Sequence, residues 1–240
     1  MTTLFISDLH LDQSRPRILE LFEQFLATEA RHADALYILG DLFESWVGDD
    51  DDSSLATRVA SALHELGRDG VPVYFMAGNR DFLLGPDYAR RCGMTLLADG
   101  TVVDLHGTPT VLLHGDTLCT DDLEYQAFRA QVRDPAWQQQ FLAQPLGTRR
   151  AYAAQARDAS KAHTGSSDMT IMDVTPAAVM QALKQAGVRH MIHGHTHRPA
   201  VHALEVDGQP AQRIVLGDWY EQGSVLRVDA HARRLQSLMP

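Results

Sequence analysis

Short apolar runs recur along the chain and are its clearest pattern. They cover residues 3–7, 35–39, 71–77, 110–114 and 190–194. Near-continuous hydrophobicity over so few residues is typical of strands buried on both faces, although periodicity alone also allows buried helical pieces. Amphipathic stretches at residues 15–30 and 53–70 separate the first runs. This alternation predicts an α/β layered fold with at least a partly parallel sheet.

The last third of the chain follows a different pattern. Residues 200–208, 211–219 and 223–230 alternate apolar and polar positions between glycine-marked turns, which predicts antiparallel strands. Two packed sheets flanked by helices would accommodate both patterns. With 240 residues, 45% of them hydrophobic, the chain can bury one sizeable core, so we expect a single domain over residues 1–240.

One segment interrupts this order, from about residue 122 to residue 168. Its spacing is helical, it lies between two strand runs, and it carries six Lys or Arg against five Asp or Glu. The rest of the chain is strongly acidic, so the charge pattern singles this segment out. We interpret it as an inserted helical lid. The acidic run at residues 48–52 is interpreted as a solvated loop.

The bulk composition excludes several classes of protein. A formal net charge of −10 argues against a general nucleic-acid binder, which needs clustered Lys and Arg. The two cysteines, Cys92 and Cys119, lack the paired spacing of a disulfide framework or a thiolate zinc site, and they fit a reducing compartment. Neither a signal peptide nor a membrane-spanning run is evident, so we expect a soluble or peripheral protein.

Polar side chains follow each apolar run at the point where a strand would end. In chain order they are Asp8-Leu9-His10, Gly40-Asp41, Gly78-Asn79-Arg80-Asp81, His114-Gly115-Asp116 and Gly194-His195-Thr196-His197. In a layered α/β fold such groups collect along one edge of the sheets. On extended backbone, the two polar side chains of Asp-x-His, and likewise those of His-x-His, would face the same side.

These side chains are of the types that bind metal ions. Oxygen and nitrogen ligands without a thiolate indicate manganese, iron, zinc or magnesium, and the imidazoles make magnesium the poorest match. Alone, Asp-x-His or Gly-Asp is usually a cap or a turn, but five such elements in order favour a metal site. The candidate ligands exceed one tetrahedral site, so we expect two ions that share a carboxylate. They are Asp8, His10, Asp41, Asn79, His114, His195 and His197.

Together these elements resemble the motifs of the calcineurin-like metallophosphoesterases. The resemblance implies a sandwich of two mixed β-sheets flanked by helices, with a dinuclear site at its edge. It implies that one ion is held by Asp8, His10, Asp41 and His197, and the other by Asp41, Asn79, His114 and His195. Water would then attack phosphorus directly, without a covalent enzyme intermediate.

Arg80 departs from the wider family, most members of which carry histidine at this position as a proton donor to an alcohol leaving group. Arginine cannot act as that acid, because its pKa is above about 12, but it can hold phosphate through paired hydrogen bonds. A phosphate leaving group, with a second pKa of about 6, departs without protonation. Arg80 therefore favours cleavage of a pyrophosphate bond.

The Gly-Asn-Arg-Asp variant, with residues 40–50, 114–122 and 193–199, resembles the UDP-2,3-diacylglucosamine pyrophosphohydrolases of Gram-negative bacteria over essentially the full length. This resemblance implies attack at the α-phosphorus, giving UMP and 2,3-diacylglucosamine 1-phosphate for lipid A biosynthesis. It implies manganese as the usual activator of two divalent sites. It also implies a peripheral position on the anionic cytoplasmic face of the inner membrane, with no obligate protein partner evident.

The resemblance also assigns site residues. The catalytic set would be Asp41, Asn79, Arg80, His114 and His195. The substrate contacts would be Asn79, Arg80, Asp122, Ser160, Thr164, Ser167 and His195. Relatives commonly have asparagine and lysine where this chain has Thr164 and Ser167, and Lys161 is an alternative basic contact.

The insert suits a lipid substrate independently of the resemblance. Its apolar residues could shelter acyl chains or pack the lid onto the body, and its arginines could bind phosphate or anionic headgroups. These residues are Phe128, Trp137, Phe141, Leu142, Leu146 and Tyr152, with Arg149, Arg150 and Arg157. Trp46 and Phe82 could be core or acyl contacts. The rival functions are a soluble nucleotide or dinucleoside polyphosphate pyrophosphatase, and a noncatalytic scaffold.

Overall fold

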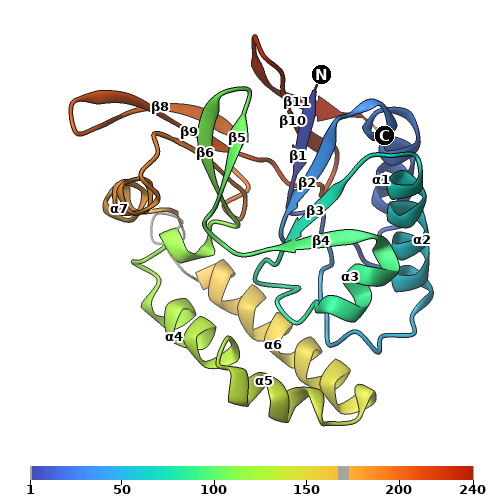
Figure 1. The fold of residues 1–240 in the computed structure, drawn as a ribbon. Helices are drawn as coiled ribbons and strands as arrows, with labels where there is room; N and C mark the ends of the chain where they lie inside the picture. Colours follow the sequence, from blue (N-terminus) through green and yellow to red (C-terminus); the bar gives the residue numbers. More distant parts are fainter. Residues whose placement is uncertain (1, 167–172, 240) are drawn as a thin grey trace.

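Two mixed β-sheets pack face to face in the computed structural model, which describes residues 2–166 and 173–239, with the backbone alone for residues 159–166 (Figure 1). The first sheet has the order β11-β10-β1-β2-β3-β4, and the second has the order β5-β6-β7-β9-β8. Strands β1 to β4 run parallel, as do β6, β7 and β9, while β5, β8, β10 and β11 pair antiparallel. The expected two-sheet α/β sandwich is therefore confirmed.

The strand bounds match the apolar runs closely. The first sheet comprises β1 (Thr3–Ile6), β2 (Ala35–Leu39), β3 (Val73–Met76), β4 (Met94–Leu97), β10 (Gly223–Val228) and β11 (Arg233–Leu238). The second comprises β5 (Thr101–Leu105), β6 (Thr108–Leu113), β7 (His190–His193), β8 (Ala200–Val206) and β9 (Gln209–Val215). The sequence pattern did not predict β4, β5 or β11, because these edge strands are half exposed and lack a continuous apolar run.

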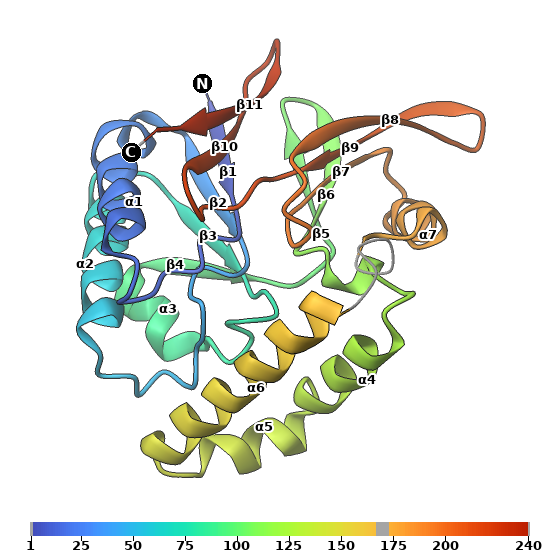
Figure 2. The same ribbon diagram turned by 180° about the vertical axis from the view of Figure 1, so that it is seen from behind.

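Helices cover the outer faces of both sheets, as Figures 1 and 2 show. The first sheet carries α1 (Pro16–Thr28), α2 (Ser54–Arg68) and α3 (Pro86–Cys92), and the second carries α7 (Pro176–Ala186). Short 3₁₀ turns occupy Ala30–His32 and Asp116–Leu118. In α1, the buried side chains of Ile18, Phe22 and Phe25 recur at helical spacing and face the sheet. Helix α2 is capped by Ser53, whose hydroxyl accepts a hydrogen bond from the Ala56 amide.

Three consecutive helices lie across the edge where the strands end. They are α4 (Leu123–Val132), α5 (Pro135–Leu142) and α6 (Leu146–Ser166), and we call them the lid helices. They occupy the segment interpreted from its spacing as a helical insert. None of the helices within the described ranges combines the length and the apolar character that crossing a bilayer requires.

The acidic run at residues 48–52 is a loop in which Asp50 and Asp52 are largely exposed, as interpreted, but it also makes structural contacts that the sequence did not indicate. The Asp49 carboxylate accepts hydrogen bonds from the backbone amides of Gly85, Asp87 and Tyr88 at 2.8–3.0 Å, which caps the start of α3. Asp50 pairs with Arg149 of α6. The run therefore joins the body of the protein to the lid helices.

Two lid arginines expected to bind phosphate are engaged in this junction instead. Arg149 is only 3% exposed; its guanidinium donates to both Asp50 carboxylate oxygens and to the Val47 carbonyl. Arg150 pairs with Asp51 and Asp52 on the surface. Because the acidic run pairs with both side chains, they anchor the lid helices to the body and are not available to bind a phosphate.

The buried ring of Trp219 connects the core to the strand end of β1. It packs edge-on against Phe22 and Phe25, at centroid distances of 6.2 and 5.7 Å. Its backbone amide donates to the Asp8 carbonyl at 3.1 Å, and its indole Nε1 donates to the Ser224 carbonyl at 3.0 Å. Trp219 thereby supports the backbone of a candidate metal ligand.

We expect Trp219→Ala to lower the free energy of unfolding by about 3–5 kcal/mol, because it leaves a large cavity and an unpaired buried carbonyl. Urea unfolding measures this change. Val201→Ala is the control, since Val201 is 51% exposed and should change stability by less than about 0.5 kcal/mol. Equal losses in the two variants would contradict a core role for Trp219.

Candidate metal centre

The candidate ligands gather where β1, β2, β3, β6 and β7 end. These strands are parallel within each sheet, so their carboxyl ends reach one edge, beneath the lid helices. Each polar segment begins one or two residues after its strand ends. The order of strands therefore brings together side chains that are up to 189 positions apart in numbering.

Both residues of the Asp-x-His pair and both histidines of the His-x-His pair have left-handed backbone. The prediction that extended backbone places each pair on one side was therefore wrong. Asp8, His10, Asp41, His195 and His197 all have φ between 49° and 68°. Such a conformation costs a non-glycine residue about 1 kcal/mol or more and persists only where the surroundings enforce it. Here the Asp8 amide donates to the Gly40 carbonyl at 3.0 Å, and the His10 amide donates to the Asp41 carbonyl at 2.9 Å.

Two motif glycines permit the close approach of these segments. A Cβ on Gly78 would overlap the Asp41 carboxylate, and a Cβ on Gly194 would overlap the Asp8 carboxylate and the Ser7 side chain. Any other residue would push the two strand ends apart. The glycines of the Gly-Asn-Arg-Asp and Gly-His-Thr-His motifs are thus required by packing at the centre.

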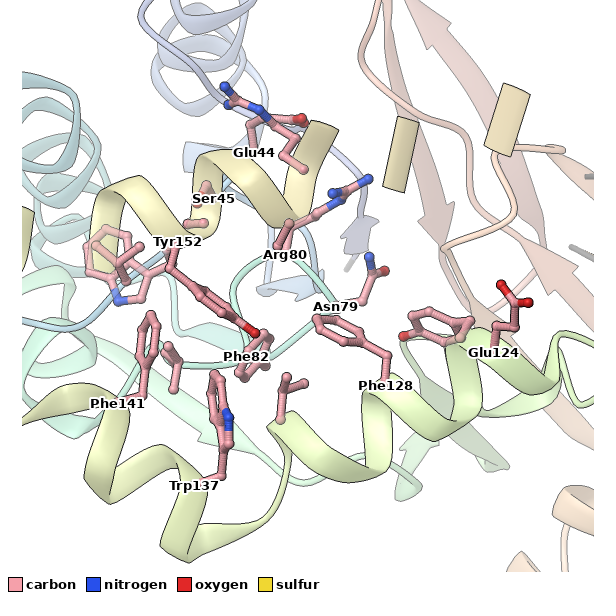
Figure 3. Close-up of a pocket in the computed structure, with 18 residues that line it drawn as sticks. Glu44, Ser45, Asn79, Arg80, Phe82, Glu124, Phe128, Trp137, Phe141 and Tyr152 are labelled. Atoms are coloured by element: carbon pink, nitrogen blue, oxygen red, sulfur yellow. The ribbon is translucent and has the colours of Figure 1, made fainter. Parts of the chain in front are cut away.

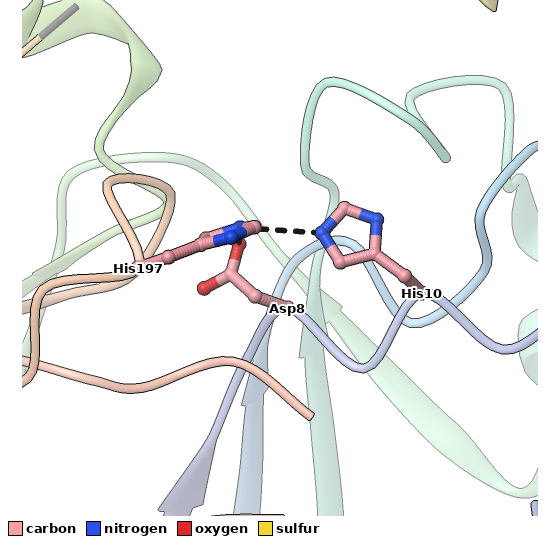
Figure 4. A group of neighbouring side chains, drawn as sticks. All are labelled: Asp8, His10 and His197. Carbon is pink, nitrogen blue, oxygen red and sulfur yellow. Dashed lines mark hydrogen bonds and ion pairs between the residues drawn. The ribbon is translucent and has the colours of Figure 1, made fainter. Parts of the chain in front are cut away.

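One half of the centre contains Asp8, His10 and His197, whose ligand atoms all lie within 4.8 Å of one another (Figure 4). The Nε2 atoms of His10 and His197 face each other at 3.3 Å. His197 Nε2 is 3.4 Å from Asp8 Oδ1, and His10 Nε2 is 3.7 Å from Asp41 Oδ2. Two carboxylates and two imidazoles therefore converge on one point.

Two further carboxylates orient these imidazoles from behind. His10 Nδ1 lies 3.0 Å from Glu44 Oε2, and His197 Nδ1 lies 3.2 Å from Asp218 Oδ2. A carboxylate at Nδ1 fixes the proton there and aims the Nε2 lone pair into the centre. Two such lone pairs facing each other fit a shared cation. Sequence reasoning missed Glu44 and Asp218, although each lies in a segment that follows a buried strand.

The other half contains Asp41, Asn79, His114 and His195. Asn79 Oδ1 lies 2.9 Å from both His114 Nε2 and His195 Nδ1. His114 Nδ1 donates to the Leu39 carbonyl at 2.8 Å, which aims its Nε2 at the amide oxygen and, at 3.7 Å, at Asp41 Oδ1. Asp41 therefore offers one oxygen to each half, the arrangement that a bridging ligand needs.

Charge within the centre favours bound protons or a cation. Burial opposes protonation of His114, but the charges of Asp41, Asp116 and Asp8 raise its pKa to about 9. Burial likewise opposes protonation of His197, but the hydrogen bonds that its ring donates to Asp218 and Asp8 raise its pKa to about 10. Divalent ions would replace these protons. Burial and the neighbouring His114 instead lower the pKa of His195 to about 4, which leaves it neutral.

Two buried carboxylates hold the segments in place, and sequence reasoning assigned them no role. Asp81 accepts hydrogen bonds from the amides of Leu42 at 2.7 Å and Gly78 at 2.8 Å, which ties the Asp41 segment to the Asn79 segment. Burial and the charge of Asp41 raise its pKa to about 6. Asp116 accepts from Tyr125 Oη and Arg129 Nε, both at 2.7 Å, and so anchors α4 to the centre.

A cavity of ≈ 350 Å³ lies between the centre and the lid helices (Figure 3). Asn79 and Arg80 line it near the centre, and the rest of its wall is largely apolar. The apolar wall includes Trp46, Phe82, Phe128, Val132, Trp137, Phe141 and Tyr152. Leu142 and Leu146, which were expected on this face, do not line it. Trp46 is both a cavity residue and a core residue, because it also packs on Phe43 and Tyr88.

The remaining expected substrate contacts fall elsewhere. Asp122 is buried and caps α4 by accepting a hydrogen bond from the Tyr125 amide at 3.0 Å, and it does not line the cavity. This placement favours a structural role, because capping uses the carboxylate. Ser167 and the side chains of Ser160, Lys161 and Thr164 lie outside the described residues.

Comparison with known proteins agrees with this geometry. Residues 1–199 match the family model described as calcineurin-like phosphoesterase. The chain is similar to the UDP-2,3-diacylglucosamine hydrolase of Xanthomonas axonopodis pv. citri (strain 306), with 59% identity over 99% of both chains. It is equally similar to that of Stenotrophomonas maltophilia (strain K279a), at 59% identity over 99% of both chains. The chain therefore belongs to the calcineurin-like phosphoesterases and, within them, to the family of the UDP-2,3-diacylglucosamine hydrolases.

Proposed function

We propose that this chain hydrolyses the pyrophosphate bond of UDP-2,3-diacylglucosamine at the α-phosphorus, giving UMP and 2,3-diacylglucosamine 1-phosphate for lipid A biosynthesis. The observation that carries the proposal is the apolar cavity opening beside the ligand cluster at Asn79 and Arg80. It provides an apolar site for acyl chains within reach of a phosphate-binding side chain. The names of the relatives support the same substrate.

The donor set fits two divalent ions. One would be held by Asp8, His10, Asp41 and His197, and the other by Asp41, Asn79, His114 and His195. Mixed carboxylate, amide and imidazole donors without thiolate suit manganese. When bound, such a pair supplies a water of lowered pKa and polarises the phosphoryl oxygens.

Arg80 is placed to hold the departing phosphate. Its backbone is fixed on both sides, because its amide donates to Asp41 Oδ1 at 2.8 Å and its carbonyl accepts from the Trp46 amide at 3.0 Å. Its side chain lines the cavity next to Asn79. A guanidinium in this position binds phosphate without donating its proton, which suits a leaving group that departs as an anion.

The exposed side of the lid helices suits contact with a membrane. Leu123 and Leu142, neither of which lines the cavity, are large apolar side chains exposed there. Because an acylated substrate resides in a bilayer, we place the protein peripherally on the cytoplasmic face of the inner membrane, with the lid helices toward the lipid. Arg157 is the remaining lid arginine that borders the cavity.

The proposal is tested by comparing manganese-loaded protein on UDP-2,3-diacylglucosamine and on UDP-N-acetylglucosamine, with UMP release as the measurement. We expect hydrolysis of the diacyl substrate to exceed that of the acetyl sugar by about 100-fold or more in kcat/KM, because remote binding energy supports the reaction. Similar rates on both would favour a soluble nucleotide pyrophosphatase. Turnover of neither would favour the noncatalytic scaffold.

We expect Arg80→His to reduce kcat for the diacyl substrate about 100-fold, since a positioned cationic donor to the leaving phosphate is lost. Manganese content should stay unchanged, because no arginine is among the metal ligands. Arg90→His is the matched control, as Arg90 is exposed on α3 and pairs only with Asp87 among the described residues. A normal rate for Arg80→His would contradict its leaving-group role.

Manganese affinity should rise with pH. His114 and His197 have raised pKa values of about 9 and 10 among the protein groups alone, so both hold a proton at pH 7 and must release it to ligate. Each proton released makes the association constant increase about tenfold per pH unit below those pKa values. Calorimetric titration at pH 6.5 and 7.5, in two buffers of different ionisation enthalpy, measures the association constant for manganese and the number of protons released. An affinity independent of pH would contradict this account.

A further inference from the structure

We propose that Arg15 and Tyr220 form a subsite for the nucleotide end of the substrate, the uridine monophosphate half. This inference rests on the proposed function. It concerns the end of the metal centre beside His10 and His197, and neither residue lines the apolar cavity. Neither residue is among the candidate ligands or the expected substrate contacts.

Tyr220 bounds one end of the centre. Its ring stacks on His10 at a centroid distance of 5.2 Å and an interplanar angle of 12°, and it lies 5.4 Å from the His197 ring. Tyr125 bounds the opposite end, 5.9 Å from His195, and lines the cavity. Tyr220 nevertheless remains 45% exposed, so part of its ring is accessible to a ligand.

Arg15 covers the ring of Tyr220. Its guanidinium carbon lies 4.9 Å from the Tyr220 ring centroid, and its Nη2 reaches the Leu9 carbonyl only at 3.4 Å. Its Nη1 is shielded from solvent yet has no hydrogen-bond partner among the described residues. No carboxylate of the described residues pairs with Arg15. A cationic donor left unsatisfied beside a phosphate-processing centre points to an anionic ligand.

A second unsatisfied donor faces the same region from the lid. Arg157 Nε is also buried without a partner among the described residues, while Arg157 Nη1 is 3.9 Å from Asp12 Oδ2. Asp12 lies three residues before Arg15, so Arg157 reaches the loop that follows β1 and leads to Arg15.

The geometry of the reaction assigns this end to the nucleotide. With the α-phosphorus at the centre, the lipid phosphate departs in line toward Arg80 and the cavity, and the ribose oxygen lies to the side of that line. The end bounded by His10, His197 and Tyr220, opposite Tyr125, offers such a side. Arg15 offers donors to phosphate and ribose oxygens, and the exposed ring of Tyr220 offers surface to the pyrimidine.

The test is binding of UMP to the manganese-loaded protein, measured by calorimetry without substrate, together with product inhibition of turnover by UMP and by 2,3-diacylglucosamine 1-phosphate. Arg15→Gln and Tyr220→Leu are the test variants. Arg17→Gln is the matched control, because Arg17 is exposed in the first turn of α1, close to the N-cap residue Arg15, and lies outside both sites. Thermal unfolding and manganese content verify that each variant is folded and loaded.

We expect Arg15→Gln to weaken UMP binding about tenfold or more, as expected for a lost charged hydrogen bond, and Tyr220→Leu to weaken it as well. Inhibition by the lipid phosphate should not change in Arg15→Gln, and Arg17→Gln should match the unchanged protein in both measurements. Unchanged UMP affinity in Arg15→Gln, or equal loss for UMP and the lipid phosphate, would overturn the subsite. Arg15-dependent UMP binding without hydrolysis of the diacyl substrate would instead refute only the proposed function.

Discussion

The structure depends on a convergence of buried charged and polar groups at one edge of the sandwich. The Nε2 atoms of His10 and His197 lie 3.3 Å apart, and the buried Asp8 and Asp41 carboxylates lie beside them. The left-handed backbone at these positions is itself unfavourable. The folded core holds this arrangement in place, since each segment continues a buried strand whose position is set by both sheets. The core offsets the unfavourable free energy of this arrangement, and a bound cation would neutralise the buried carboxylates.

The supporting carboxylates show how this convergence is maintained. Asp81 binds the amides of two different segments, and Glu44 and Asp218 each hold an imidazole from behind. None of the three belongs to the candidate ligand set. Their positions fix the orientation of the ligands, which determines where a phosphate can bind and where its leaving group can go.

The sequence allowed prediction of the parts that depend on local pattern. The apolar runs predicted β1, β2, β3, β6 and β7, and the residues after those strands are the ones that converge at the centre. Features that depend on tertiary pairing were not predictable. Edge strands such as β4 lack a continuous apolar run, and the Asp50–Arg149 pair joins residues 99 positions apart. For the same reason the acidic run looked like a solvated loop, because nothing near it in sequence reveals its basic partner.

The anchoring of the lid helices limits how a substrate can enter. Helix α4 is tied to the strand ends through Asp116, and α6 is tied to the body through the buried Arg149. Moving the lid helices away from the body would require one of these ion pairs to break. With both anchors intact, the width of the cavity between the lid helices and the body limits which molecules fit.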